Sequence, residues 1–258
     1  MSYIRDTAIV LKQTPYREHD ARVVLFGRMS GKLSAVARGL KRPHAKQSGH
    51  LEPFSEIEVM IAKGASFDKL AVARVASPRL QLRKRLSSLA IAGSFFDLVE
   101  RLTRPDSRDE MLYALLVEML NVADGLEHDP SAVRGRLLLN AATLKLLDLL
   151  GYALHLDACV VCGESLRDPV MFAASAGGLL CEPCAREKRR EYPHAFSLPP
   201  HVLGLLRFLR LRPLSDVLNV TATTELFTAA SVVIEESLRH APLVAEPKGA
   251  ETVLRMLA

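Results

Sequence analysis

Hydrophobic residues follow a period of two in the first part of the chain. Short stretches rich in β-branched residues alternate apolar and polar positions, which is the pattern of half-buried strands. Turn-forming residues separate these stretches, among them Met29-Ser30-Gly31 and Lys63-Gly64-Ala65-Ser66. The pattern predicts five strands, at residues 4–11, 22–28, 32–37, 57–62 and 69–75. Five short antiparallel strands favour a small closed barrel of the OB type, because closure leaves no unpaired edge strand.

After Pro78 the hydrophobic period changes to that of an α-helix. The pattern predicts one helix that ends at Arg104-Pro105, a second over residues 109–122, and a third that Asp129-Pro130-Ser131 opens and Gly151 closes. The third helix is apolar on nearly every side, so we expect it at the centre of a helical bundle. Two further helices are expected after Pro199-Pro200 and after Thr223-Thr224.

These elements predict a multidomain α+β protein. Residues 1–77 are expected to form a five-stranded OB-fold β-barrel. Residues 78–258 are expected to form an α-helical domain that carries a zinc ribbon, a zinc-binding insertion at about residues 157–190. The length of 258 residues is consistent with two domains.

Four cysteines, all between residues 159 and 184, give the most specific chemical signal. They form two C-x-x-C units with 18 residues between them, which lies inside the window for a four-cysteine zinc site. Four thiolates leave no coordination position for water or substrate, so the expected cofactor is one structural Zn²⁺ per chain. Its predicted ligands are Cys159, Cys162, Cys181 and Cys184. Four reduced buried thiols, or a redox pair, are the alternatives.

Charge is distributed unevenly along the chain. Residues 1–85 contain 17 Lys and Arg against 7 Asp and Glu, a net charge of +10, whereas residues 86–258 contain 17 against 22, a net charge of −5. A basic segment of this kind is typical of a surface that meets nucleic-acid phosphates. A solvated basic face without a partner is the alternative interpretation.

The predicted DNA contacts therefore lie in the barrel and in its basic loop at residues 39–50. They are Arg22, Arg28, Lys32, Arg38, Lys41, Arg42 and Lys46, and the cations that could extend this track are Lys63, Lys69, Arg83, Lys84 and Arg85. The chain has no tryptophan, so base stacking is poorly supplied, with Tyr16, Phe26 and Phe54 as the available aromatic residues. We expect binding to DNA with little sequence preference.

Sequence motifs for catalysis are missing. The sequence has no P-loop, no Rossmann glycine motif and no nucleophile elbow, which predicts a protein that is not an enzyme. The N-terminal residues do not have the pattern of a signal peptide, and no stretch is apolar enough to span a bilayer. A cytoplasmic location without membrane contact is expected.

The order of several short segments resembles the RecO family of bacterial recombination mediators. The resemblance covers residues 1 to about 200. It rests on Ala21-Arg22-Val23-Val24-Leu25-Phe26, Gly31-Lys32-Leu33, Ala37-Arg38-Gly39, Leu51-Glu52-Pro53-Phe54, Leu150-Gly151-Tyr152, Cys159-Val160-Val161-Cys162-Gly163 and Gly177-Gly178-Leu179-Leu180-Cys181.

This resemblance implies a role in DNA repair and recombination after DNA damage. Members of the family bind single- and double-stranded DNA and anneal complementary strands. They act with RecR and single-stranded DNA-binding protein so that RecA can load, which makes RecA an indirect partner. Partner binding is expected beside the most apolar helix, at Arg134, Arg136 and Lys145. A zinc-ribbon transcription or translation factor and a metalloenzyme are the alternative functions.

Overall fold

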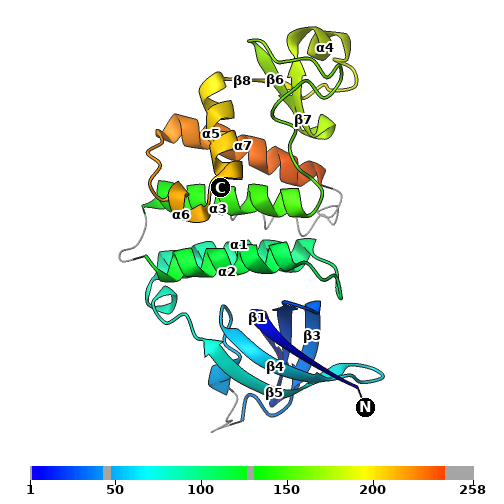
Figure 1. Ribbon diagram of the computed structural model, residues 1–258, viewed down its shortest axis with the longest axis vertical. Coiled ribbons are helices and arrows are strands. Elements are labelled where there is room, and N and C mark those ends of the chain that lie inside the picture. The colour runs from blue at the N-terminus through cyan, green and yellow to red at the C-terminus, as the bar shows by residue number, and fades with distance from the viewer. Residues whose placement is uncertain (1, 43–47, 127–130, 242–258) are drawn as a thin grey trace. The chain divides into compact units, whose positions relative to one another are not determined.

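The computed structural model describes residues 2–42, 48–126 and 131–241 (Figure 1). Backbone contacts divide the chain into two compact units, Met1–Asp129 and Pro130–Ala258. None of the helices formed by the described residues is both long enough and apolar enough to cross a membrane.

A closed five-stranded barrel forms the first part of unit 1. Its strands are β1 (Tyr3–Tyr16), β2 (Asp20–Gly27), β3 (Gly31–Ala37), β4 (Glu56–Ala62) and β5 (Asp68–Ser77). They close in the order β1-β2-β3-β5-β4, with β3 and β5 parallel and the other pairs antiparallel. This barrel confirms the predicted fold.

All five predicted strands are present, but β1 is longer than expected. It continues to Tyr16 because its first half pairs with β4 and its second half pairs with β2. The interior of the barrel is apolar, and Val23, Leu25, Ile57 and Ile61 are fully buried there. Alternate residues of the same strands therefore face outward, and these determine what the barrel presents to solvent.

Two helices complete unit 1, α1 (Leu86–Leu102) and α2 (Glu110–Asp124). The side chain of Asp109 caps α2 by accepting a hydrogen bond from the Leu112 amide at 2.9 Å. Leu82, expected in the first helix, instead lies in a short 3₁₀ turn, where its amide donates to the Asp124 carboxylate at 2.8 Å. Helix α1 packs against both α2 and β1, and it therefore covers part of the outer face of the barrel.

The expected boundary near Ser77-Pro78 coincides with the change from strand to helix. The compact units divide later, after Asp129, because α1 and α2 pack within the same unit as the barrel. The division into domains at residues 1–77 and 78–258 stays a prediction.

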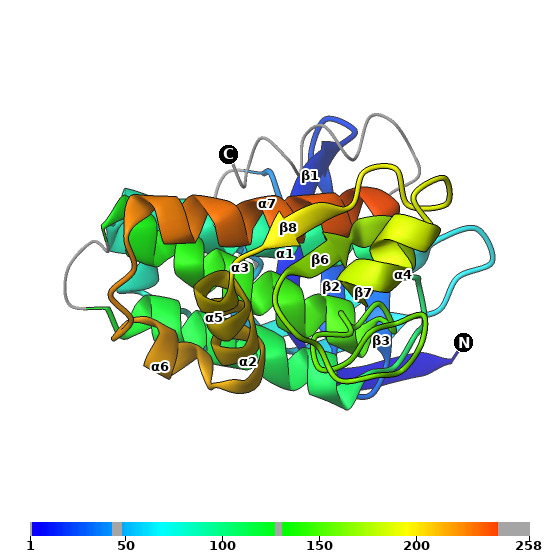
Figure 2. The same cartoon turned by 90° about the horizontal axis from the view of Figure 1, so that it is seen from above.

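Unit 2 is built around α3 (Ala132–Leu149), which packs against α5 (Pro200–Leu211), α6 (Leu214–Val217) and α7 (Thr224–His240). Figure 2 shows α3 and α7 running side by side. Most of the side chains of α3 are buried, which confirms its expected central position. The buried Asn140 amide donates to the Ser231 hydroxyl of α7 at 2.9 Å, so this buried polar side chain is satisfied.

A small ribbon lies between α3 and α5 in the chain. It contains β6 (Val170–Ala173), β7 (Gly178–Cys181), α4 (Glu182–Glu187) and β8 (Phe196–Leu198), with the sheet order β7-β6-β8. The residue before β7, Gly177, has a φ of +72°, a left-handed conformation that glycine adopts without strain. The ribbon thus occupies the predicted insertion, and its third strand extends beyond residue 190.

Candidate metal centre and nucleic-acid interface

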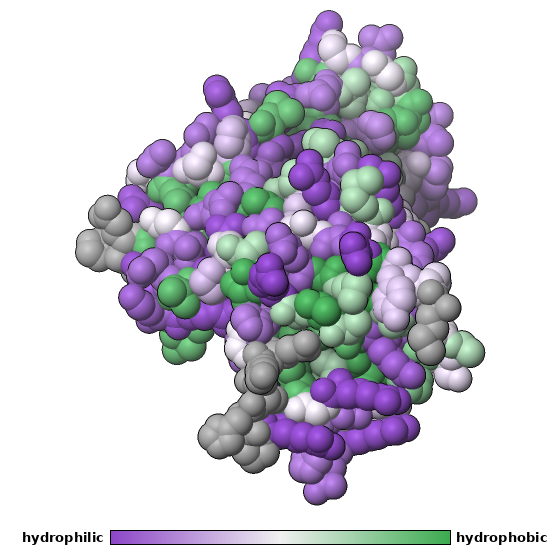
Figure 3. Space-filling view, turned by 60° about the horizontal axis from the view of Figure 1, so that its bottom comes forward, coloured by the Kyte–Doolittle hydropathy of each residue, from purple (hydrophilic) through white to green (hydrophobic). Residues whose placement is uncertain are grey.

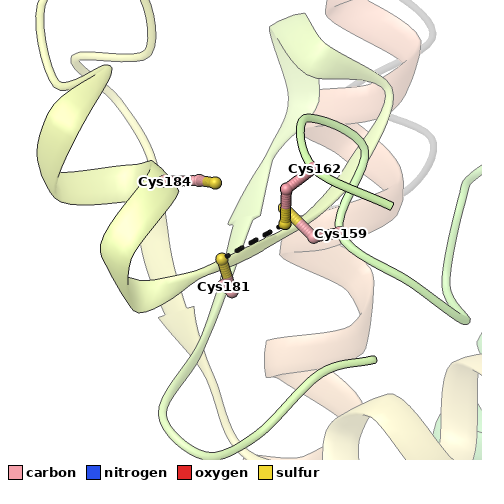
Figure 4. A group of neighbouring side chains, drawn as sticks. All are labelled: Cys159, Cys162, Cys181 and Cys184. Carbon is pink, nitrogen blue, oxygen red and sulfur yellow. Dashed lines mark hydrogen bonds between the residues drawn. The ribbon is translucent and has the colours of Figure 1, made fainter. Parts of the chain in front are cut away.

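The four cysteine sulfurs point toward one another at one end of the ribbon (Figure 4). All four lie within 4.8 Å of one another, and the Sγ atoms of Cys162 and Cys181 are 3.8 Å apart. A tetrahedral ion with bonds of about 2.3 Å requires sulfur atoms separated by about 3.8 Å. The donor set therefore fits a single metal ion with four thiolate ligands.

Local backbone structure positions both cysteine pairs. In the first pair, the Gly163 amide donates to the carbonyl of Cys159 at 2.9 Å, and the Cys159 amide donates to the carbonyl of Glu164 at 3.0 Å. Gly163 has a φ of +75°, which a side chain would make unfavourable. In the second pair, Cys181 ends β7 and Cys184 lies in the first turn of α4. Each C-x-x-C unit thus forms the tight turn that its spacing predicts.

The surroundings of the cysteine cluster shift the pKa values of two of its thiols in opposite directions. Burial opposes ionisation of Cys159, but backbone hydrogen bonds from Cys162, Cys181 and Val161 outweigh it and lower the pKa of Cys159 to about 6. A hydrogen bond with Cys181, together with burial, raises the pKa of Cys184 to about 12. Neighbouring thiolates repel one another, so ionisation of all four requires a cation among them. A bound metal ion would supply that charge.

On the barrel, backbone contacts bring the turn between β1 and β2 together with the residues that follow β3. The Lys41 amide donates to the carbonyl of His19 at 2.9 Å, and the Gly39 amide donates to the Asp20 carboxylate at 2.8 Å. Five exposed cations lie on this part of the barrel, and we name them the turn cluster. Its members are Arg17, Arg22, Arg38, Lys41 and Arg42.

The turn cluster adjoins a groove between β3 and the loop that joins β4 to β5. The groove has a volume of about 360 Å³, and its lining includes Arg22, Ser34, Val36 and residues 64–68. OB-folds bind oligonucleotides on the face of their second and third strands, together with the first and fourth loops. The turn cluster thus lies where this fold binds nucleic acid. Figure 3 shows hydrophilic side chains crowded along the lower edge of the view, over the barrel.

Two of the expected DNA-contact residues lie elsewhere. Arg28 is exposed at the opposite end of β2, six residues beyond Arg22, or about 20 Å along the strand. The Lys32 ammonium donates to the carbonyl of Thr103 at 3.0 Å and to the carbonyl of Glu100, at the end of α1. Desolvation by burial lowers the pKa of Lys32. Lys32 therefore stabilises the packing of α1 on the barrel, which argues against its expected contact with DNA.

Lys46 lies outside the described residues. Among the cations expected to extend the track, Arg83 donates to the Pro53 carbonyl at 2.6 Å and to the Ser55 hydroxyl at 2.9 Å, which fixes the loop before β4. The Lys63 ammonium is 2.8 Å from the Asp68 carboxylate, and Lys69 lies over the Phe67 ring. Lys84 is exposed, and Arg85 donates to the carbonyl of Gln81. Most of these cations thus have partners within the barrel unit.

Of the three aromatic residues considered for stacking, Phe26 is fully buried and unavailable, contrary to the expectation. Phe54 packs edge-on against Phe96, with ring centroids 5.2 Å apart. Tyr16 is half-buried, and the guanidinium groups of Arg17 and Arg22 lie 5.3 and 5.6 Å from its ring centroid. Arg17 was absent from the expected contacts, although its place directly after Tyr16 in the sequence was a usable signal.

The three expected partner-binding residues of α3 do not form one surface. Arg134 is exposed, Arg136 stacks 4.8 Å from the Phe227 ring centroid, and the Lys145 ammonium donates to the Arg210 carbonyl at 3.0 Å. Lys145 comes eleven positions after Arg134, which is about 16 Å along a helix. Of the three, Arg134 is therefore the side chain that the structure leaves exposed.

Comparison with known proteins accounts for both parts of the chain. Residues 1–79 match the family model described as recombination protein O N terminal, and residues 83–241 match the model described as recombination protein O C terminal. The chain belongs to the RecO family. The two models meet at the end of β5, where the strands give way to helices.

Several curated proteins with the name DNA repair protein RecO are similar over most of their length. The protein from Rubrobacter xylanophilus is 32% identical over 245 residues, which cover 94% of both chains. That from Anaeromyxobacter dehalogenans is 31% identical over 241 residues and 92% of both chains. That from Symbiobacterium thermophilum is 35% identical over 182 residues, or 69% of this chain and 70% of the relative. The RecO resemblance seen in the sequence is thereby confirmed.

Proposed function

We propose that this RecO-family chain is a recombinational DNA repair mediator that binds single- and double-stranded DNA and anneals complementary strands. The observation that carries this proposal is the turn cluster, five exposed cations at the position where OB-folds bind nucleic acid. Its family membership supplies the repair context.

The proposed mechanism is electrostatic. The cations of the turn cluster bind the phosphate backbone, and their charge reduces the repulsion between two strands that are to pair. Phosphate contacts carry no sequence information, so the protein anneals strands of any complementary sequence. No covalent bond changes in this process, and the chain acts without catalysis.

The proposed protein partners are RecR and single-stranded DNA-binding protein, and RecA benefits indirectly when it loads on the cleared strand. Among the expected docking residues, Arg134 is the exposed one. The proposed site of action is the cytoplasm.

The proposed metal is one structural Zn²⁺, held by Cys159, Cys162, Cys181 and Cys184. Tetrahedral thiolate coordination is typical of zinc, and a site with four protein ligands has no open position for substrate. The ion stabilises the ribbon through its backbone turns and takes no part in annealing.

The experiment is an annealing assay in which complementary strands are first coated with single-stranded DNA-binding protein and the salt concentration is then varied. The affinity of the protein for DNA is measured over the same salt series. If five phosphates are engaged, the logarithm of affinity falls against the logarithm of salt concentration with a slope of about −3.5 for single strands and about −4.5 for duplex. Affinity that does not depend on salt overturns the electrostatic mechanism. Strong preference for one sequence instead supports a transcription or translation factor.

A further inference from the structure

Two arginines from neighbouring segments of the barrel contact the ring of Tyr16. Tyr16 ends β1, Arg17 begins the turn, and Arg22 lies on β2. Their guanidinium carbons are 5.3 and 5.6 Å from the centroid of the ring, within the range of a cation–π contact. Among the described residues, Tyr16 is the one ring with two cations placed against it.

The backbone at this position is unusual. Arg17 has a φ of +61°, a left-handed conformation that residues with a side chain rarely adopt. Arg22 is held by regular strand pairing, opposite Thr14 on β1 and Val36 on β3. The two guanidinium groups therefore reach the ring from separate backbone positions, and the barrel fixes both.

Such an arrangement matches one nucleotide of a single strand. A nucleobase is flat and stacks on an aromatic face in the same way as a guanidinium group, while guanidinium groups bind phosphates through paired hydrogen bonds. In single-stranded DNA the base is free to stack on a protein side chain, whereas in a duplex it is already paired and stacked. Arg22 also lines the groove with Ser34 and Val36, so this groove adjoins the side chain that contacts the Tyr16 ring.

We infer that Tyr16 stacks on one unpaired base of single-stranded DNA, and that Arg17 and Arg22 hold the phosphates on either side of that base. This inference rests on the proposed DNA-binding function and adds a preference for unpaired strands. The phosphate contacts supply affinity for any polynucleotide, and the stacking contact distinguishes single strands from duplex.

A fluorescence experiment tests the stacking directly. The chain contains no tryptophan, so the Tyr16→Trp variant has a single indole at the proposed contact. Oligothymidylate is expected to quench this fluorescence, whereas an abasic oligonucleotide of the same length is expected to leave it nearly unchanged. The control is Tyr3→Trp, because Tyr3 is 54% exposed on the part of β1 that pairs with β4, away from the turn. Equal responses of the two variants overturn the inference.

Affinity measurements give a second test. Tyr16→Leu is expected to bind oligothymidylate about tenfold more weakly than the natural protein, which is the usual loss for one stacked base. Its affinity for the abasic oligonucleotide and for duplex is expected to stay within about twofold, and Tyr16→Phe is expected to keep the natural affinity. Equal weakening on oligothymidylate and on the abasic strand contradicts a stacking role.

The outcomes separate the inference from the proposed function. Suppose that the natural protein binds DNA with a steep salt dependence, but that the fluorescence of Tyr16→Trp and the affinity loss of Tyr16→Leu are the same with oligothymidylate and with the abasic oligonucleotide. The stacking contact is then wrong and the electrostatic mechanism stands. If the natural protein binds neither oligonucleotide at low salt, both the stacking inference and the proposed DNA-binding function are wrong. Thermal melting of Tyr16→Leu and of Tyr16→Phe shows whether either result comes from unfolding.

Discussion

The cysteine cluster of unit 2 and the turn cluster of unit 1 are assembled in different ways. The four cysteines lie within 26 residues of sequence, and two short backbone turns aim their sulfurs at one point. The turn cluster collects cations from the β1–β2 turn, from β2 and from the segment after β3, which strand pairing and two hydrogen bonds bring together. Local spacing defines the first site, whereas tertiary structure defines the second.

This difference explains how the two sites respond to change. A metal site depends on every ligand, because one missing thiolate opens the coordination shell. A surface of exposed cations is additive, because each phosphate contact contributes separately to affinity and to its salt dependence. The cysteine cluster is therefore expected to control stability, and the turn cluster to control binding.

Loss of the metal is expected to have the largest effect. Binding of structural zinc contributes about 10–16 kcal/mol in small zinc-finger peptides, so its removal is expected to destabilise the ribbon by several kcal/mol. A chelator, or the Cys181→Ser variant, is expected to lower the melting temperature and to release one metal ion per chain. Calorimetry and metal analysis measure both changes.

The control for this prediction is Ser175→Ala, an exposed position within the ribbon. It is expected to keep both the metal and the melting temperature. The salt slope of DNA binding is expected to persist in the metal-free protein as long as the barrel stays folded. A metal-free protein with unchanged stability contradicts the structural role.

The same contrast explains how much of the fold and of the two candidate sites could be predicted from the sequence. The C-x-x-C spacing identified all four candidate ligands, and alternation of apolar residues identified all five barrel strands, because both depend on neighbours in the chain. Charge counts identified the basic barrel but not which cations are exposed. Lys32 and Arg22 lie on paired strands of the same sheet, but Lys32 is four residues along β3 from the residue that pairs with Arg22, and its ammonium donates to the end of α1.

The second largest effect is expected from the turn cluster itself. The triple variant Arg22→Ala, Arg38→Ala and Lys41→Ala removes three proposed phosphate contacts. It is expected to reduce the magnitude of the salt slope by about 2 to 3 and to weaken annealing strongly at physiological salt. Its melting temperature is expected to stay unchanged, because all three side chains are exposed. Fluorescence anisotropy at several salt concentrations measures the slope.

A matched control removes the same charge from other exposed positions of unit 1. The variant Arg5→Ala, Arg74→Ala and Arg104→Ala has its substitutions on β1 near its start, on β5 and after α1. If this variant reduces the slope as much as the triple variant of the turn cluster, general charge rather than the turn cluster accounts for binding.

Lys32→Met is expected to lower the stability of the protein and to leave the salt slope of DNA binding unchanged, which is the opposite of what loss of a DNA contact does. This change removes the hydrogen bonds from a cationic group to the carbonyls of Glu100 and Thr103, while the methionine stem keeps the apolar packing. Hydrogen bonds of this kind contribute about 1.5–3 kcal/mol, so we expect a loss of about 2 kcal/mol in the free energy of unfolding. Denaturant titration measures this loss. An unchanged stability with a lower salt slope restores Lys32 to the DNA surface.

Single substitutions of two arginines at opposite ends of one strand are expected to give the smallest change in salt slope. They locate the DNA-binding surface most finely. Arg22 and Arg28 are both exposed on or beside β2, about 20 Å apart, and each has its charge removed by substitution with alanine. With an oligonucleotide shorter than this separation, Arg22→Ala is expected to reduce the slope magnitude by about 0.7, the contribution of one phosphate, and Arg28→Ala to leave it unchanged. A longer strand that passes along the barrel reaches both residues and makes the two variants alike. Equal effects on the short strand would show that DNA also binds at the far end of β2, and the binding surface would then extend well beyond the turn cluster.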